Sequence, residues 1–67
     1  MSDVARVTES AARSRDSFED AIKVGVARAT ETLRSVTSAW VKEQQVEIEN
    51  GQVVEYQVNL LVMFVLE

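Results

Sequence analysis

The dipeptide Asn50-Gly51 is the feature that most constrains the fold of this 67-residue chain. Both central positions of a type I′ turn need positive φ, and Asn-Gly is the favoured pair for that two-residue hairpin loop. A tight turn also fixes the register of the strands that it joins. In that register Glu49 faces Gln52, and Trp40 faces Leu61. The sequence therefore predicts a β-hairpin centred on residue 50.

The second strand of the hairpin is predicted to run over residues 52–67, and its side chains alternate between two faces. One face is apolar and is joined across the hairpin by Ala39 and Val41, so it should carry the rest of the core. Its members are Val54, Tyr56, Val58, Leu60, Val62, Phe64 and Leu66. The opposite face is polar near the turn and apolar at its far end, with Glu55, Gln57, Asn59, Leu61, Met63 and Val65.

An amphipathic helix is predicted over residues 17–35. Ser17 and Asp20 have the spacing of a capping box, which satisfies free N–H groups at a helix start. Apolar residues then recur three and four positions apart, and Gly25 would allow a close approach to the surface that the helix covers. The apolar stripe consists of Phe18, Ile22, Val26, Ala29 and Leu33, and the solvated side carries Lys23, Glu31 and Arg34. Before the helix, residues 4–12 form a weak strand pattern.

These elements predict an α+β fold with the order β-α-β-β in a single domain, residues 1–67. One helix covers one face of a three-stranded antiparallel sheet, and the apolar end of the other face is left exposed. Such a patch on a small protein normally marks an interface. The chain has no cysteine or histidine for disulfides or soft metal sites, so self-association is the expected support for its small core.

Composition also limits the function. The net charge of −4 and the scattered basic residues argue against a nucleic-acid partner, which requires clustered Lys and Arg. The longest apolar run, Leu60 to Leu66, is far shorter than the roughly 20 residues of a membrane span. We therefore expect a cytoplasmic protein with no membrane partner. No catalytic pair or phosphate-binding loop is visible, so an enzyme is not expected.

The single tryptophan, Trp40, is the main candidate for a binding residue. The predicted register sets it on the exposed sheet face beside an aliphatic floor and a row of amides. That mixture suits a flat aromatic ligand with a polar edge, although a lone tryptophan beside Leu and Met is more often a packing anchor in a protein interface. The predicted pairs on this face are Ser38 with Met63, Trp40 with Leu61, Lys42 with Asn59, and Gln44 with Gln57.

Acidic residues near the hairpin turn are the only candidate metal site. Glu47, Glu49 and Glu55 would collect a hard cation such as calcium or magnesium if a symmetric interface brought them together. The alternative is a solvated acidic edge that discourages unwanted strand pairing.

The chain resembles the dodecins, small flavin-binding proteins. The matching segments are "SFEDAI", "ARATETLR", "EQ", the "NG" turn, "EYQV" and a closing "VxFxLE", in order along nearly the whole chain. The resemblance implies a hollow homododecamer that binds pairs of flavins, riboflavin or FMN, and stores or sequesters them. It further implies that a tryptophan stacks on the flavin and that a glutamine, matching Gln57, hydrogen-bonds to it.

The sequence departs from the family pattern at the stacking position. Ser38 stands where the family has tryptophan, and Trp40 follows two residues later; Gln45 and Val46 replace Arg and Gly. Two hypotheses follow. In the first, Trp40 substitutes for the missing ring and a flavin is bound by Trp40, Gln57, Gln44, Ser38 and Gln45. In the second, Met63 and Trp40 close the pocket, so the shell binds no flavin and either has no ligand or holds a divalent cation or another small ligand.

Overall fold

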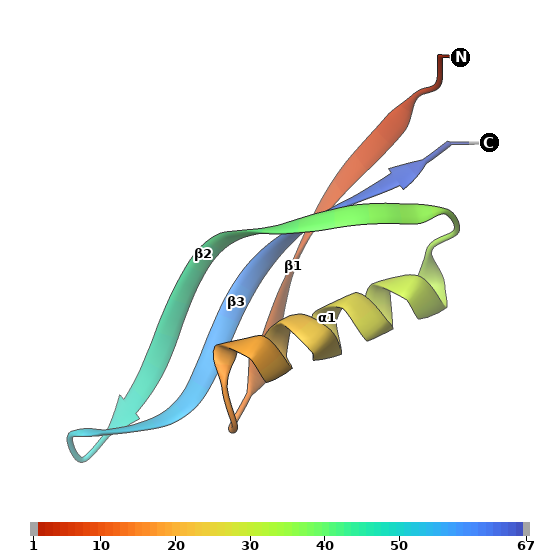
Figure 1. Ribbon diagram of the computed structural model, residues 1–67. Coiled ribbons are helices and arrows are strands. Elements are labelled where there is room, and N and C mark those ends of the chain that lie inside the picture. The colour runs from red at the N-terminus through yellow and green to blue at the C-terminus, as the bar shows by residue number, and fades with distance from the viewer. Residues whose placement is uncertain (1, 67) are drawn as a thin grey trace.

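The computed structural model describes residues 2–66. The chain forms strand β1 (Ala5–Ser14), helix α1 (Phe18–Thr32), strand β2 (Val36–Glu49) and strand β3 (Gln52–Val65). The three strands make one antiparallel sheet in the order β1-β3-β2, with α1 on one side (Figure 1). The predicted α+β fold is therefore confirmed. The last strand was predicted to end at residue 67, and that residue lies outside the described residues.

The hairpin turn has the predicted conformation. Asn50 and Gly51 have φ of 52° and 76°, as a type I′ turn requires. Beyond the end of β1, the two strands that this turn joins extend past the rest of the molecule as a two-stranded arm (Figure 1). The arm gives the molecule its elongated shape of 53 × 19 × 14 Å.

Irregularities in the β2–β3 pairing change the register in the middle of the hairpin. Shifts occur between Glu47 and Ile48 and between Val41 and Glu43. Because one shift undoes the other, the predicted pairs at both ends are confirmed: Glu49 with Gln52, Trp40 with Leu61, and Ser38 with Met63. Between the shifts, the predicted pairs are wrong by one residue. Asn59 pairs with Glu43 in place of Lys42, Gln57 pairs with Gln45, and Gln44 pairs with Val58.

Helix α1 starts as predicted and ends earlier than predicted. The Ser17 side chain accepts a hydrogen bond from the backbone N–H of Asp20 at 2.9 Å, and Ser14 Oγ donates to Asp20 Oδ2 at 2.6 Å. These bonds tie the first turn to the end of β1. The helix stops at Thr32 and not at residue 35, because Leu33 is already extended and Ser35 has a left-handed backbone with φ of 56°.

The core is small and lies between α1, β1 and β3. Its buried members are Ala12, Ala21, Val58, Leu60 and Val62. The helix approaches closely because its innermost positions are Ala21 and Gly25, and a Cβ at Gly25 would lie 2.5 Å from Cδ1 of Leu60. The predicted apolar stripe flanks this row and is only half-buried.

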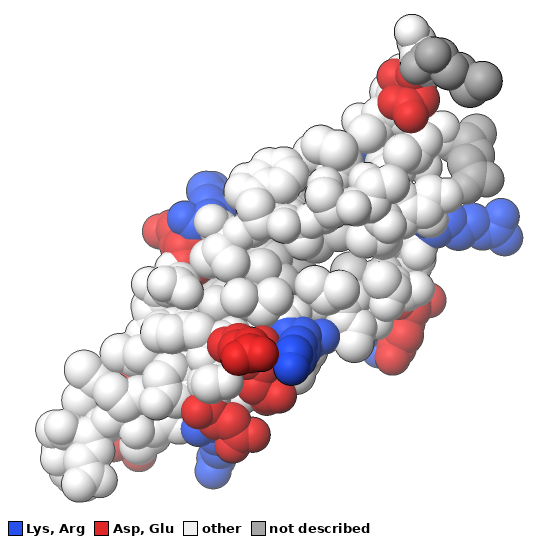
Figure 2. Space-filling model, viewed as in Figure 1, with Lys and Arg blue, Asp and Glu red and all other residues white. Residues whose placement is uncertain are grey.

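Strand β2 is left almost bare, because α1 lies mainly against β1 and β3. Within β2, Val36 and Val46 are half-buried and the other residues are exposed. An open hollow of about 480 Å³ separates α1 from β2, with Ile22, Val26 and Val41 among its lining residues. On the face shown in Figure 2, Lys and Arg side chains are spread over the surface, and several of them lie beside Asp or Glu side chains. Among the described residues, no helix combines the length and apolar character that crossing a membrane would take.

Candidate ligand-binding face

The sheet has one face that α1 does not cover, here called the open face. Its central strand is β3, flanked by β1 and β2, and the register assigns the side chains that share it. They are Ala5, Val7, Glu9, Ala11 and Arg13 from β1; Gln57, Asn59, Leu61, Met63 and Val65 from β3; and Ser38, Trp40, Glu43 and Gln45 from β2.

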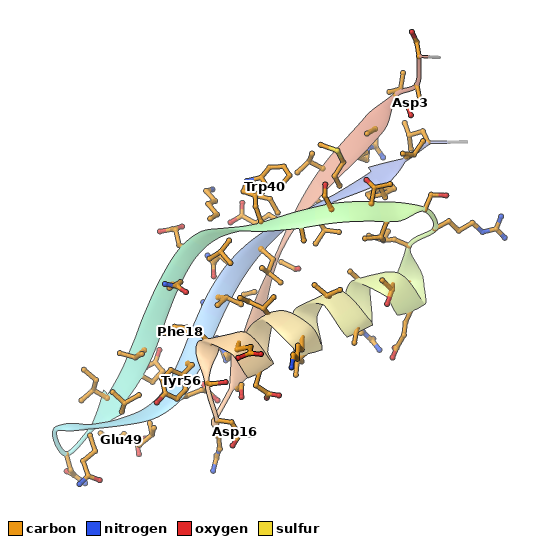
Figure 3. All side chains as sticks on the ribbon, in the orientation of Figure 1. Asp3, Asp16, Phe18, Trp40, Glu49 and Tyr56 are labelled. Atoms are coloured by element: carbon orange, nitrogen blue, oxygen red, sulfur yellow. The ribbon has the colours of Figure 1, made fainter. Side chains whose placement is uncertain are left out.

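Trp40 stands out from the open face. Its side chain projects from β2 on the side away from α1 (Figure 3), and the residue is 44% exposed. Its cross-strand partner Leu61 is half-buried, and Met63, the next residue along this face, is half-buried too. An exposed indole above an aliphatic floor is able to stack on a flat ligand or to anchor a second protein chain.

An ion pair crosses the sheet next to this indole. Lys42 Nζ lies 3.2 Å from Glu9 Oε1, and both side chains are about half exposed. Because Glu9 pairs with Leu61, the bridge passes from β2 to β1 over the central strand. A partly exposed pair of this kind contributes at most about 1 kcal/mol to stability. Its main effect is to separate the apolar end of the open face from the polar end.

The polar end is organised around Gln57, which is only 9% exposed. Arg13 Nε donates a hydrogen bond to Gln57 Oε1 at 2.9 Å. Gln57 Nε2 in turn donates to Asn59 Oδ1 at 3.0 Å. The amide that the sequence identified is therefore held in one orientation by two side chains.

The structure separates the predicted site residues into two groups. Ser38 and Trp40 lie at the apolar end, opposite Met63 and Leu61, as predicted. Gln57 and Gln45 pair at the polar end. Ser38 and Gln57 are six strand positions apart through Met63, which corresponds to about 20 Å at roughly 3.3 Å per residue. The nearest members of the two groups, Trp40 and Gln57, are four strand positions apart through Leu61, about 13 Å at roughly 3.3 Å per residue.

The predicted placement of Gln44 on this face is wrong. It pairs with Val58, whose side chain is completely buried toward α1. The extra residue at Lys42 reverses the alternation for the following stretch of β2, so the two adjacent glutamines exchange faces. Gln45 takes the position beside Gln57 that the sequence assigned to Gln44.

Arg13 and Asn59 are the polar residues of the site that the sequence reading missed. The first strand was predicted to end at Ala12, whereas β1 continues to Ser14 and brings Arg13 opposite Gln57. No signal in the sequence marks this extension, because small and polar residues occupy both faces of the strand over residues 9–14. Asn59 was set on the correct face but was not recognised as the partner of the Gln57 amide.

The acidic residues near the turn do not form a metal site within one chain. Glu47, Glu49 and Glu55 line a common hollow together with Arg15 and Val54, and Glu49 lies near the tip of the arm (Figure 3). Over residues 2–66, however, no group of three or more acidic side chains is close enough to hold a metal ion. The residues would need a second chain to complete a cation site.

Comparison with known proteins assigns the family. The Dodecin family model matches residues 4–67. A dodecin from Streptomyces coelicolor is 38% identical, with a TM-score of 0.92 over 97% of this chain and 93% of that one. The tt0972 protein from Thermus thermophilus is 39% identical, with a TM-score of 0.92 over 98% and 97% of the two chains.

A third similar structure is described as the calcium chelating immunodominant antigen, calcium dodecin, from Mycobacterium tuberculosis, with a novel calcium-binding site. It is 26% identical, with a TM-score of 0.84 over 96% of this chain and 91% of that one. The search of curated proteins found no match. The match of the family model to nearly the whole chain, together with the β-α-β-β fold, shows that this chain belongs to the dodecin family.

Proposed function

We propose that this dodecin binds a flavin, riboflavin or FMN, and stores or sequesters it inside a hollow homododecamer. The observation that carries the proposal is that the open face presents a 44% exposed indole and a pre-oriented glutamine amide. A flat aromatic ring with a hydrogen-bonding edge requires those two elements. The proposed role is binding and not catalysis.

The proposed site is shared between copies of the chain. Trp40 is opposite Leu61, four strand positions from Gln57, which is about 13 Å at roughly 3.3 Å per residue. In the proposed site, a flavin stacks on the indole of one copy and receives its amide contact from a neighbouring copy. Assembly through the open face would also cover Met63 and Val65, the half-buried apolar residues at its end.

Trp40, Gln57, Gln45 and Ser38 are the proposed flavin-binding residues. Ser38 stands at the family's stacking position and is exposed, so its small side chain leaves room beside the indole. Gln44 is left out of the proposed site because it shares a face with Val58.

Native mass spectrometry tests the proposal directly. The purified protein would be mixed with excess riboflavin or FMN, desalted and weighed. A twelve-subunit mass that carries several flavins would support both the shell and the binding function. The same shell without flavin would contradict flavin binding. It would favour the second hypothesis, a shell that holds a cation, for which the calcium dodecin relative provides a precedent; calcium added to the same sample would then be the next ligand to weigh.

Replacing Trp40 by alanine should abolish most flavin fluorescence quenching. Base or flavin stacking on an aromatic side chain is worth about 1–3 kcal/mol, so the expected loss of affinity is roughly tenfold to a hundredfold. Titration of riboflavin fluorescence would measure it. The matched control is Trp40→Phe, which keeps an aromatic face and should retain part of the affinity. Equal quenching by the alanine variant would move the site away from Trp40.

A further inference from the structure

The three polar side chains at the polar end of the open face form a directed hydrogen-bond chain. Arg13 Nε donates to Gln57 Oε1 at 2.9 Å, and Gln57 Nε2 donates to Asn59 Oδ1 at 3.0 Å. A guanidinium has only donors, whereas each amide has both a donor and an acceptor end. Asn59 can therefore satisfy the Gln57 amide in either orientation. Arg13 is the member of the chain that determines the direction.

The directed chain produces a defined order of groups. Going from β1 into β3, the open face offers donors of Arg13, then the acceptor Oε1 and then the donor Nε2 of Gln57. Beyond these two bonds, Gln57 Oε1 keeps one free lone pair and Gln57 Nε2 keeps one free hydrogen. If the amide were reversed, two donors would follow one another and the acceptor would come last.

We propose that Arg13 is a positioning residue that orients the Gln57 amide, so that the site selects ligands with an imide edge. An imide presents an acceptor, a donor and an acceptor, which complements the order donor, acceptor, donor. The pyrimidine ring of a flavin has this edge, so the inference deepens the proposed function and rests on it for the ligand. The orientation of Gln57 by Arg13 is a property of the protein without ligand.

Because the Gln57 amide is buried, its orientation affects which ligands can bind. Gln57 is 9% exposed, so a mismatched donor or acceptor on the ligand would leave a polar group that water reaches poorly. Leaving such a group unsatisfied costs more than a hydrogen bond gains. Arg13 is at the matching register position on β1, close enough to restrain the amide before any ligand arrives.

The binding experiment compares riboflavin with 3-methylriboflavin, which lacks the imide N–H. The intact protein should bind riboflavin at least about tenfold more tightly, because the methyl group replaces the ligand N–H that would donate to the second lone pair of Gln57 Oε1. Arg13→Met should reduce this ratio to within about threefold, whereas Arg13→Lys, which is also donor-only, should keep it. Arg15→Met removes a nearby exposed charge and should not change the ratio. Equal affinity of the intact protein for both flavins, or an unchanged ratio in Arg13→Met, would overturn the inference.

A second readout needs no ligand. In protein labelled with ¹⁵N-glutamine, the Gln57 side-chain amide is assigned as the signal that Gln57→Glu removes. We expect one sharp amide pair in the intact protein and in Arg13→Lys, and a split or broadened pair in Arg13→Met. An unchanged pair in Arg13→Met would refute positioning by Arg13. If the pair splits but no flavin binds to the intact protein, the proposed function fails while the positioning role stands.

Discussion

Replacing Gly25 by alanine should destabilise this protein, although alanine is the better helix former. A Cβ at this position would lie 2.5 Å from Cδ1 of Leu60 and 3.0 Å from Cβ of Ala12. Both neighbours belong to the buried core, so neither can move without disturbing other contacts. Overpacking of this kind costs about 1–3 kcal/mol. Urea unfolding at fixed protein concentration should show a corresponding fall in the free energy of unfolding.

The matched control for this variant is the exposed helix residue Ala27. Exchanging Ala27 for glycine removes a methyl group where nothing is packed against it, so it reports helix propensity alone, about 1 kcal/mol. Propensity would therefore make Gly25→Ala stabilising by a similar amount. If Gly25→Ala proved as stable as the parent or more so, the close contact between α1 and β3 would be wrong.

Apolar periodicity predicted the helix but not the residues that it buries. The cap at Ser17 and the presence of an amphipathic helix followed directly from the sequence. The predicted apolar stripe, however, followed the large residues, whereas the buried row is formed by Ala21 and Gly25. Small residues give a weak hydrophobic signal, but they permit the closest packing. Spacing alone could not show that the helix would turn its small residues, and not its larger ones, toward Leu60.

The hairpin shows a different limit. The Asn50-Gly51 turn determined the pairing next to it, and the pairs around Trp40 were also predicted correctly, because the two intervening shifts cancel. Between them the sequence gives little guidance. Lys42, Glu43, Gln44 and Gln45 are all polar, so no alternation reveals which of them lies on which face. A bulge inserts one residue and reverses the faces that follow, and for this reason Gln44 and Gln45 were exchanged.

The open face could be located from the sequence, but its internal contacts could not. Alternation placed Trp40 and Gln57 on the face opposite the helix, and the register confirms this. The hydrogen bond from Arg13 to Gln57 joins residues 44 positions apart, and it depends on β1 continuing past Ala12. A single additional pair of strand residues therefore determines whether the Gln57 amide has a partner on β1.

A charge on the apolar end of the open face should break the proposed assembly. Val65 is half-buried and pairs with Ala5, so no basic side chain is its cross-strand partner. Burying an aspartate there without a partner should cost about 3 kcal/mol or more, which corresponds to over a hundredfold weaker association. We expect Val65→Asp to elute as smaller species in size-exclusion chromatography. Leu61→Asp should act in the same direction, because its cross-strand neighbour Glu9 carries the same charge and Lys42 is already paired with Glu9.

The control for this charge is Ala27→Asp, on the exposed row of α1 that also carries Lys23 and Glu31. It adds the same carboxylate to a surface that the proposed assembly leaves in solvent, so the large species should persist. An intact assembly in Val65→Asp would show that the open face is not the contact between copies. Because the proposed flavin site takes its indole and its amide from different copies, that result would also remove the basis for a shared flavin site. The oligomeric state of one variant therefore tests the interface and the geometry of the binding site together.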